Sequence, residues 1–296
     1  MKKPLLVLAP VVLIALLGVT ACGTSNAPAA APAASTPAAT APAATTPATT
    51  ASATQTANPV GLAMTILPGG KLGPDGKMHD IFSPTDLTVV QGQATTVTVY
   101  NYDTGAHSFT SKDLNLNVMI PGAKKDGAPA VTTFTINATK AGDFHWLCTV
   151  KCDTDANGWA MANDGYMAGT VHVLAQQPDH DTLAMTIKDG AKLGPDGKMH
   201  DVFTNTDLTV RKGVPAQVTV YNYDTGDHSF TSKDLGLNVH ILGAKKAGVP
   251  SVTTFTINAT KTGSFHWLCT IKCDSDANGW AMANNGYMAG TVTVVD

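Results

Sequence analysis

The chain has 296 residues, a length that suggests about two domains. Charged residues make up 14% of it, the formal net charge is −3, and no basic cluster is present. A nucleic-acid-binding protein needs a positive surface for phosphates, so this composition argues against that class. The five cysteines are too few for a disulfide-dense scaffold.

The N-terminal residues have the features of an export signal. Two lysines precede an apolar run over 5–19, which is shorter than the ~20 residues that a membrane-spanning helix needs. A basic start followed by a short apolar stretch predicts a secretory signal peptide. The run ends in Val-Thr-Ala-Cys at 19–22, which resembles the lipobox of bacterial lipoproteins, where the cysteine is lipidated. We expect a signal peptide over 1–22 with Cys22 lipidated, and ordinary cleavage nearby is the alternative.

Residues 23–58 consist almost entirely of Ala, Pro, Thr and Ser, with no charge and no large apolar side chain. Such a segment cannot bury a core, and frequent proline favours extended polyproline II at roughly 3.1 Å per residue. We therefore expect a disordered tether that reaches ~100 Å at most. With a lipidated Cys22, it would hold the folded part at the extracytoplasmic face of the cell membrane, anchored without spanning it.

The rest of the sequence is an internal duplication with a constant offset of 121 residues. Over the 113 aligned positions 62–174, the second copy differs at 26 positions and needs no gap. Each copy is long enough to hold its own core, and only a short segment joins them. The sequence predicts one domain over 59–175 and a second over 182–296.

Within the first copy, short stretches of alternating apolar and polar residues are separated by turns, which is typical of strands. A Gly-Pro-Asp-Gly turn comes first, at 73–76. The predicted strands then follow in the order 86–90, 96–100, 133–137, 143–148 and 170–174. No segment has a helical period, so we expect an all-β fold in which each copy is a Greek-key β-sandwich.

The direction of the strands predicts which end of the sandwich carries chemistry. If consecutive strands run antiparallel, the strand that ends before His107 finishes near His79. If Cys148 also emerges at that end, all the sulfur-bearing and imidazole-bearing candidates meet there. These candidates are His79, His107, Cys148, Cys152, Met161 and Met167.

Two segments of each copy resemble the cupredoxin family. In the first copy, Tyr-Asn-Tyr-Asp at 100–103 leads to His-Ser-Phe at 107–109, and Ala-Gly-Asp-Phe-His-Trp-Leu-Cys occupies 141–148. In that family the histidine and the cysteine of such segments bind copper, and a methionine follows before a Gly-x-Val strand. The resemblance implies three copper ligands in this copy, namely His107, Cys148 and Met167.

A second cysteine, Cys152, gives the Cys-x3-Cys spacing of the binuclear CuA centre of cytochrome oxidase subunit II and nitrous oxide reductase. The CuA pattern also has a histidine just ahead of the methionine, where this chain has Asn163 instead. His79 is the best available second nitrogen donor, and a rim histidine that binds no metal is the alternative. His145 is expected to face away from the site because strand side chains alternate, and Met161 is expected to serve as packing.

The predicted copper ligands are therefore those of the first copy and their counterparts 121 residues on: His107, Cys148, Cys152, Met167, His79, His228, Cys269, Cys273, Met288 and His200. Thiolate, imidazole and thioether donors also suit copper on chemical grounds. The alternative for each cysteine pair is a disulfide, because an exported protein meets an oxidising compartment.

Three functions follow from these alternatives. The first is a membrane-tethered electron carrier with one copper site per domain, which needs a redox partner protein. The second is a copper-holding or delivery protein that binds Cu(I) reversibly through an incomplete ligand set. The third is a metal-free surface binding module with disulfides. We expect the first, and we expect no enzymatic activity, because the sequence holds no hydrolase-type constellation of residues.

The lipobox resemblance predicts that the mature protein begins at a lipidated Cys22. Mass spectrometry of protein taken from its native membrane should give an N-terminal peptide that starts with Cys22 and carries acyl chains. The variant Cys22→Ser should leave the membrane fraction, because a tether without acyl chains has nothing to insert. A mature N-terminus elsewhere, or an unmodified Cys22, would contradict the prediction.

Overall fold

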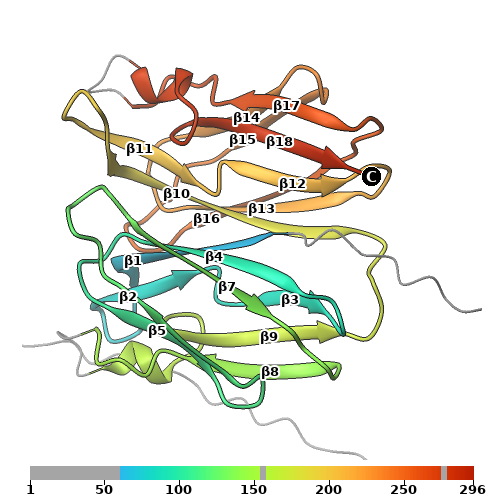
Figure 1. Cartoon of the computed structure of the whole chain (residues 1–296). Helices are drawn as coiled ribbons and strands as arrows, with labels where there is room; N and C mark the ends of the chain where they lie inside the picture. The colour runs from blue at the N-terminus through green and yellow to red at the C-terminus, as the bar shows by residue number, and fades with distance from the viewer. Residues whose placement is uncertain (1–60, 154–157, 275–278) are drawn as a thin grey trace, which may run out of the picture. The chain divides into compact units, whose positions relative to one another are not determined.

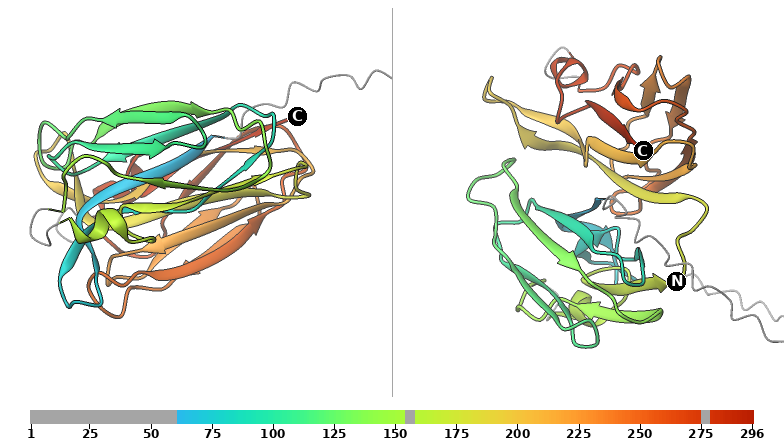
Figure 2. Two further views of the ribbon diagram at one scale, coloured as in Figure 1. Left: turned by 90° about the horizontal axis from the view of Figure 1, so that it is seen from below. Right: turned by 45° about the vertical axis from the view of Figure 1, so that its right-hand side comes forward.

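The computed structural model describes residues 61–153, 158–274 and 279–296. Within these ranges the chain forms β-strands and short 3-10 turns, arranged as two β-sandwiches (Figures 1 and 2). The prediction of an all-β fold with two tandem sandwiches is confirmed. The signal peptide, the tether and Cys22 lie outside the described residues. In the described part of the chain, no helix has the length and apolarity needed to cross a membrane.

Each sandwich consists of a four-stranded and a five-stranded sheet. In the first copy these sheets have the orders β2-β1-β4-β7 and β3-β9-β8-β5-β6. Strands β1 and β4 are parallel, as are β3 and β9, and the other neighbouring pairs are antiparallel. The bounds are β1 Leu62–Leu72, β2 Met78–Ser83, β3 Leu87–Val90, β4 Thr95–Asn101, β5 His107–Ser111, β6 Leu116–Ile120, β7 Ala130–Ile136, β8 Gly142–Leu147, the 3-10 turn η2 Trp159–Ala162, and β9 Ala168–Leu174.

The second copy repeats this topology, with sheets in the orders β11-β10-β13-β16 and β12-β18-β17-β14-β15. Here β10 and β13 are parallel, as are β12 and β18. The bounds are β10 Asp181–Leu193, β11 Met199–Thr204, β12 Asp207–Arg211, β13 Ala216–Asn222, β14 His228–Ser232, β15 Leu237–Ile241, β16 Ser251–Ile257, β17 Gly263–Leu268, the 3-10 turn η4 Trp280–Ala283, and β18 Ala289–Val295.

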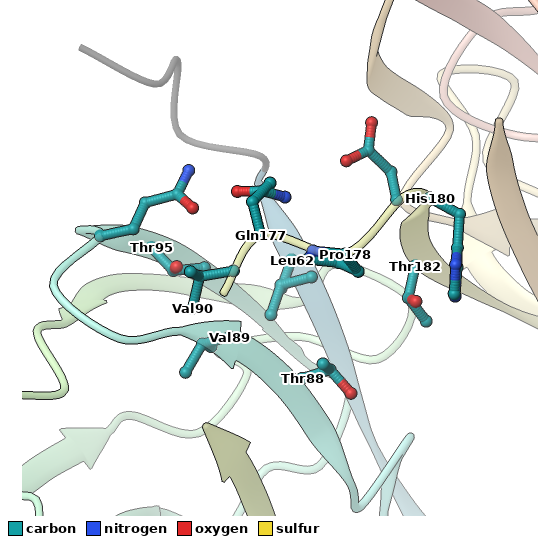
Figure 3. A pocket seen from close by; sticks show the side chains of 11 residues that line it. Leu62, Thr88, Val89, Val90, Thr95, Gln177, Pro178, His180 and Thr182 are labelled. Carbon is teal, nitrogen blue, oxygen red and sulfur yellow. The ribbon is translucent and has the colours of Figure 1, made fainter. Parts of the chain in front are cut away.

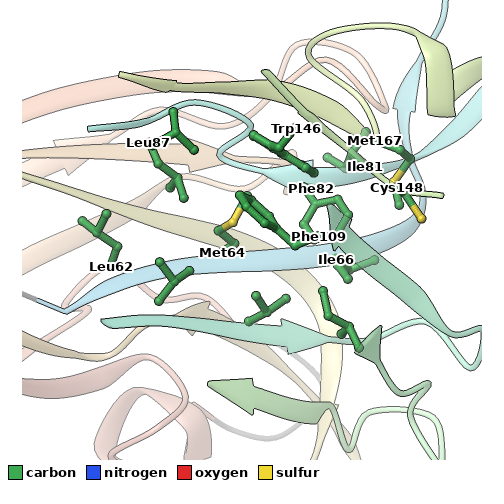
Figure 4. Close-up of a cluster of buried hydrophobic side chains, with 14 of the residues drawn as sticks. Leu62, Met64, Ile66, Ile81, Phe82, Leu87, Phe109, Trp146, Cys148 and Met167 are labelled. Atoms are coloured by element: carbon green, nitrogen blue, oxygen red, sulfur yellow. The ribbon is translucent and has the colours of Figure 1, made fainter. Parts of the chain in front are cut away.

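Three aromatic side chains form the centre of the first core. Trp146 of β8 stacks on Phe109 of β5 with ring centroids 4.4 Å apart, and meets Phe82 of β2 edge-on at 4.9 Å. All three side chains are buried between the two sheets. Figure 4 shows Cys148 and Met167 at one end of this cluster. The apolar core therefore encloses the end of β8, where the first cysteine emerges.

Gly169 allows β9 to pass close to the segment that precedes β3. It lies opposite Trp146 in the β8–β9 pair, and a Cβ atom placed on it would lie 2.2 Å from the carbonyl oxygen of Thr85. That carbonyl accepts a 2.9 Å hydrogen bond from the indole N–H of Trp146. The glycine of the Gly-x-Val strand therefore has a packing role beside the core tryptophan.

Four strands of the first copy are absent from the predicted set, namely β1, β2, β5 and β6. The first six residues of β1, at 62–67, are all buried, so this strand lacks the alternation that identifies a half-buried strand. β2 and β5 each contain three consecutive buried residues, so they also lack the alternation of a half-buried strand. His79 consequently lies inside β2 and not in a loop before a strand.

A small hollow lies at the other end of the first sandwich from Cys148, beside β1 and β3 (Figures 3 and 4). Leu62, Val89 and Thr95 line it together with Gln177 and Pro178 of the segment after β9. None of the histidine, cysteine and acidic clusters found among the described residues lies there. The chemistry of this domain is therefore concentrated at the opposite end.

The packing of Trp146 predicts a large loss of stability on truncation. Trp146→Ala removes a fully buried indole and should lower the free energy of unfolding of the first domain by about 3–5 kcal/mol. Urea unfolding of the full chain measures the loss, and hydrogen exchange of the β8 and β9 amides locates it. His145→Ala, on the exposed face of the same strand, should change stability by no more than about 0.5 kcal/mol. Equal losses in the two variants would contradict this account.

Candidate metal centre

Three predicted ligands of the first copy converge at one point. His107 begins β5, Cys148 follows the end of β8, and Cys152 comes four residues later. One ligand atom from each of these side chains lies within 4.8 Å of the other two, and all three residues are buried. The second copy assembles the same group from its counterparts His228, Cys269 and Cys273.

The sheet topology brings these residues together. β5 is antiparallel to β8, with Thr110 opposite Leu147, so the start of β5 lies beside the end of β8. The backbone N–H of Ser108 points at the Cys148 sulfur at 3.3 Å. The Cys148 backbone N–H donates to the carbonyl oxygen of Met167 at 2.8 Å. Two strands and the segment before β9 therefore fix the first cysteine and place the predicted methionine next to it (Figure 4).

The histidine of the group has one ring nitrogen fixed and the other without a partner. The Nε2 atom of His107 lies 2.8 Å from the Oδ2 atom of Asp103, four residues earlier. The Nδ1 atom is buried and has no hydrogen-bond partner, and the same is true of His228, whose Nε2 atom contacts Asp224. A buried polar atom without a partner is costly, so this nitrogen beside two thiols fits a metal ligand.

The two thiols of each pair are joined by a hydrogen bond between their sulfur atoms. Their sulfur atoms are 3.3 Å apart in both copies, well beyond the ~2.05 Å of a disulfide bond. The hydrogen bond from Cys152 and the donors around Cys148 outweigh burial and lower the pKa of the Cys148 thiol to about 4. The hydrogen bond to Cys148, together with burial, raises the pKa of Cys152. The donors around Cys148 therefore favour a thiolate on that residue, with the Cys152 thiol as a hydrogen-bond donor to it.

The charge of His107 responds to this thiolate. Burial acts to lower the pKa of His107, but Asp103 and the Cys148 thiolate outweigh it and raise the pKa to about 9. In metal-free protein at neutral pH, the imidazole is therefore positively charged beside a thiolate. A metal cation that displaces the Nδ1 proton would meet one nitrogen and two sulfur atoms.

The structure does not bring His79 into this group. Its Nδ1 atom lies 3.1 and 3.2 Å from the two carboxylate oxygens of Asp153, and its Nε2 atom lies 2.9 Å from Asp75. His200 is held in the same way by Asp274 and Asp196. Both ring nitrogens are occupied by carboxylates, so neither is free for a metal in this arrangement.

The remaining candidates make contacts outside the group formed by His107, Cys148 and Cys152. Asn163, at the position of the absent histidine, donates from its side chain to the Trp159 carbonyl oxygen at 2.6 Å. Met161 is partly buried and packs against the core. His145 has a side chain that is 54% exposed and contacts Asp164 on the outer face of the sheet.

Sequence reasoning missed the aspartates that hold the histidines. The signal that could have found two of them is an Asp-x3-His spacing, which relates Asp103 to His107 and Asp75 to His79. Asp153 carried no such signal, because its contact with His79 spans 74 residues of sequence.

Residues 77–158 match the family model of the cupredoxin-like domain. The first copy is a cupredoxin-like domain. The second copy has the same strand order and the same Cys-x3-Cys and histidine group, so the chain carries this domain in tandem. No curated protein matches the chain.

The solved structures that align with this chain do so with low TM-scores and low sequence identity. Copper nitrite reductase from Nitrosomonas europaea aligns over 81% of this chain and 95% of its own, with 14% identity and a TM-score of 0.29. The multicopper oxidase mgLAC aligns over 80% and 87%, with 16% identity and a TM-score of 0.29. The metal-binding domain of the Cu(I)-exporting P-type ATPase CopA of Streptococcus pneumoniae D39 aligns over 41% and 92%, with 13% identity and a TM-score of 0.27. These values support no inference about the activity of this chain.

The thiol pair predicts a pH-dependent ultraviolet signal in reduced, metal-free protein. At pH 7 each domain should show one thiolate, and the signal should disappear as the pH falls through about 4, because Cys148 and Cys269 are then protonated. His107→Ala should move the midpoint of the first domain upward, because it removes a group that lowers the pKa of Cys148. Cys148→Ser should remove half of the signal. A thiolate signal that appears only near pH 9, the ordinary range for a thiol, would contradict the prediction.

Proposed function

We propose that this protein is a membrane-tethered, extracytoplasmic copper protein that holds Cu(I) in each of its two cupredoxin-like domains. The observation that carries the proposal is the pair of thiol sulfurs 3.3 Å apart, grouped with a ring nitrogen of a buried histidine so that the three ligand atoms lie within 4.8 Å of one another. Thiolate and thioether ligands suit soft metals such as Cu(I) and zinc, and the cupredoxin-like domain favours copper between them. When bound, the ion would supply either stored Cu(I) or reversible one-electron chemistry.

The number of histidine ligands favours storage of Cu(I) over electron transfer. A mononuclear cupredoxin electron-transfer site uses two histidines, one cysteine and a weak axial ligand. Among the residues that the structure describes, a single histidine stands beside each cysteine pair, and His79 is held by two carboxylates. One imidazole and two thiols suit the monovalent ion better than the divalent one, because Cu(I) prefers soft donors.

Access to the site supports exchange of the ion. A surface hollow on the first domain is lined by Cys152 and by the carboxylates of Asp80, Asp103 and Asp153. The corresponding hollow on the second domain is lined by Cys273 and has two further aspartates, Asp189 and Asp227. Each hollow would let a cation reach the second cysteine of the pair from solvent.

Electron transfer with a redox partner protein is the second candidate. The observation that favours it is the fixed, buried arrangement of the donors, since a preorganised site changes little between oxidation states. Neither candidate is enzymatic. The lipobox resemblance and the tether composition support the membrane location for both.

Copper titration separates the candidates. Reduced full-length protein should bind Cu(I) without colour in competition with a Cu(I) chelator, with equal contributions from the two domains. His107→Ala and Cys148→Ala should each remove about half of the high-affinity Cu(I), because each destroys one of two independent sites. His145→Ala should leave binding unchanged. A strong visible absorption band in the copper-loaded protein would favour electron transfer. Oxidised cysteines with no copper uptake after reduction would overturn both candidates.

A further inference from the structure

The metal centre leaves one buried imidazole of each domain unused. His79 of β2 is fully buried, and both of its ring nitrogens contact carboxylates. Its ring also packs against Trp159 of η2, with centroids 4.6 Å apart, and against Tyr166 at 5.6 Å. His200 makes the same contacts in the second domain, with Trp280 at 4.7 Å and Tyr287 at 5.6 Å. These contacts fix the position of the imidazole ring between β2, η2 and the residue after Cys152.

The main partner of His79 is the residue that follows the second cysteine. Asp153 directly follows Cys152 and has a left-handed backbone with φ of 58°. Its carboxylate contacts His79 and accepts a 3.0 Å hydrogen bond from the backbone N–H of Ala160 in η2. Its own N–H donates to the Asp80 carboxylate at 3.2 Å. Asp153 is thus tied at once to β2 and to η2.

The two cysteines are supported in different ways. Cys148 follows directly on β8, its backbone N–H donates to the Met167 carbonyl oxygen, and its sulfur accepts a hydrogen bond from the Ser108 N–H of β5. Cys152 lies outside any strand, between β8 and η2, and the residue lines the hollow that Asp80 and Asp103 also line, while its sulfur faces Cys148. The position of Cys152 therefore depends on how its neighbour Asp153 is held.

We propose that His79, and His200 in the second domain, is a positioning residue that holds the second cysteine of the pair within bonding distance of the first through the adjacent aspartate. Its consequence for copper rests on the proposed function, but its claim about the thiols does not. Without the His79–Asp153 contact, the carboxylate of Asp153 loses its buried imidazole partner, and the segment that carries Cys152 is held to β2 only by the hydrogen bonds between Asp153 and Asp80. The thiol is then free to turn into the hollow.

Thiol reactivity tests the claim without metal. In the full chain with Cys269→Ser and Cys273→Ser, alkylation by iodoacetamide, mapped by mass spectrometry, reports Cys148 and Cys152 separately. His79→Ala should raise the alkylation rate of Cys152 by about tenfold or more, because local opening becomes easier, and should leave Cys148 slow. His145→Ala, which removes an exposed histidine that also contacts an aspartate, is the matched control. An unchanged Cys152 rate, or an equal rise at both cysteines, would overturn the proposal.

Copper affinity tests the consequence in the same background. His79→Ala and Cys152→Ser should weaken Cu(I) binding by similar factors. When combined, they should weaken it by no more than about twofold beyond Cys152→Ser alone, because both changes remove the same sulfur. A purely structural role predicts a further full loss in the double variant, and that result would overturn the proposal.

The two measurements distinguish failure of the positioning role from failure of the proposed function. A chain that takes up no copper but shows selective exposure of Cys152 in His79→Ala defeats the proposed function and supports the positioning role. A chain that binds Cu(I) tightly with or without His79 supports the proposed function and overturns the positioning role.

Discussion

The contact between two sulfur atoms at the end of one strand is the constraint on which each candidate metal site depends. Holding two thiols 3.3 Å apart requires each cysteine to be fixed by something other than a covalent bond. β8 and the Ser108 N–H hold the first cysteine, and Asp153, the residue after the second cysteine, is hydrogen-bonded to Asp80 of β2. The core tryptophan, two residues before Cys148, anchors the strand that delivers the first sulfur. Fold and site therefore share the same few residues.

The fold was largely visible in the sequence because most strands of a sandwich have one face in the core and the other in water. β4 shows this well, since Val97 and Val99 are buried and their neighbours are not. β1 escaped detection because 62–67 is buried on both faces. The parallel pairing of β1 with β4 was equally hidden, because strand order depends on contacts far apart along the chain.

The site was visible in part for a related reason. His107, Cys148 and Cys152 were found because the motifs around them are local and the strands deliver them to one end. The position of His79 near that end was also foreseen, but its partners were not. Its bond to Asp153 joins residues 74 apart, and no local pattern reveals which buried carboxylate an imidazole will meet. The number of nitrogen donors at the site could therefore not be read from spacing alone.

The unpartnered Nδ1 atom of each buried histidine has a thermodynamic consequence for the whole chain. Its interaction with the adjacent Cys148 or Cys269 sulfur offsets only part of the cost of burial, and a buried polar atom without a well-formed hydrogen bond costs about 1–3 kcal/mol. A ligand that satisfies this atom only in the folded state adds its binding free energy to folding. The occupied form would then be the longer-lived one, and proteolysis would remove mainly chains that carry no ligand.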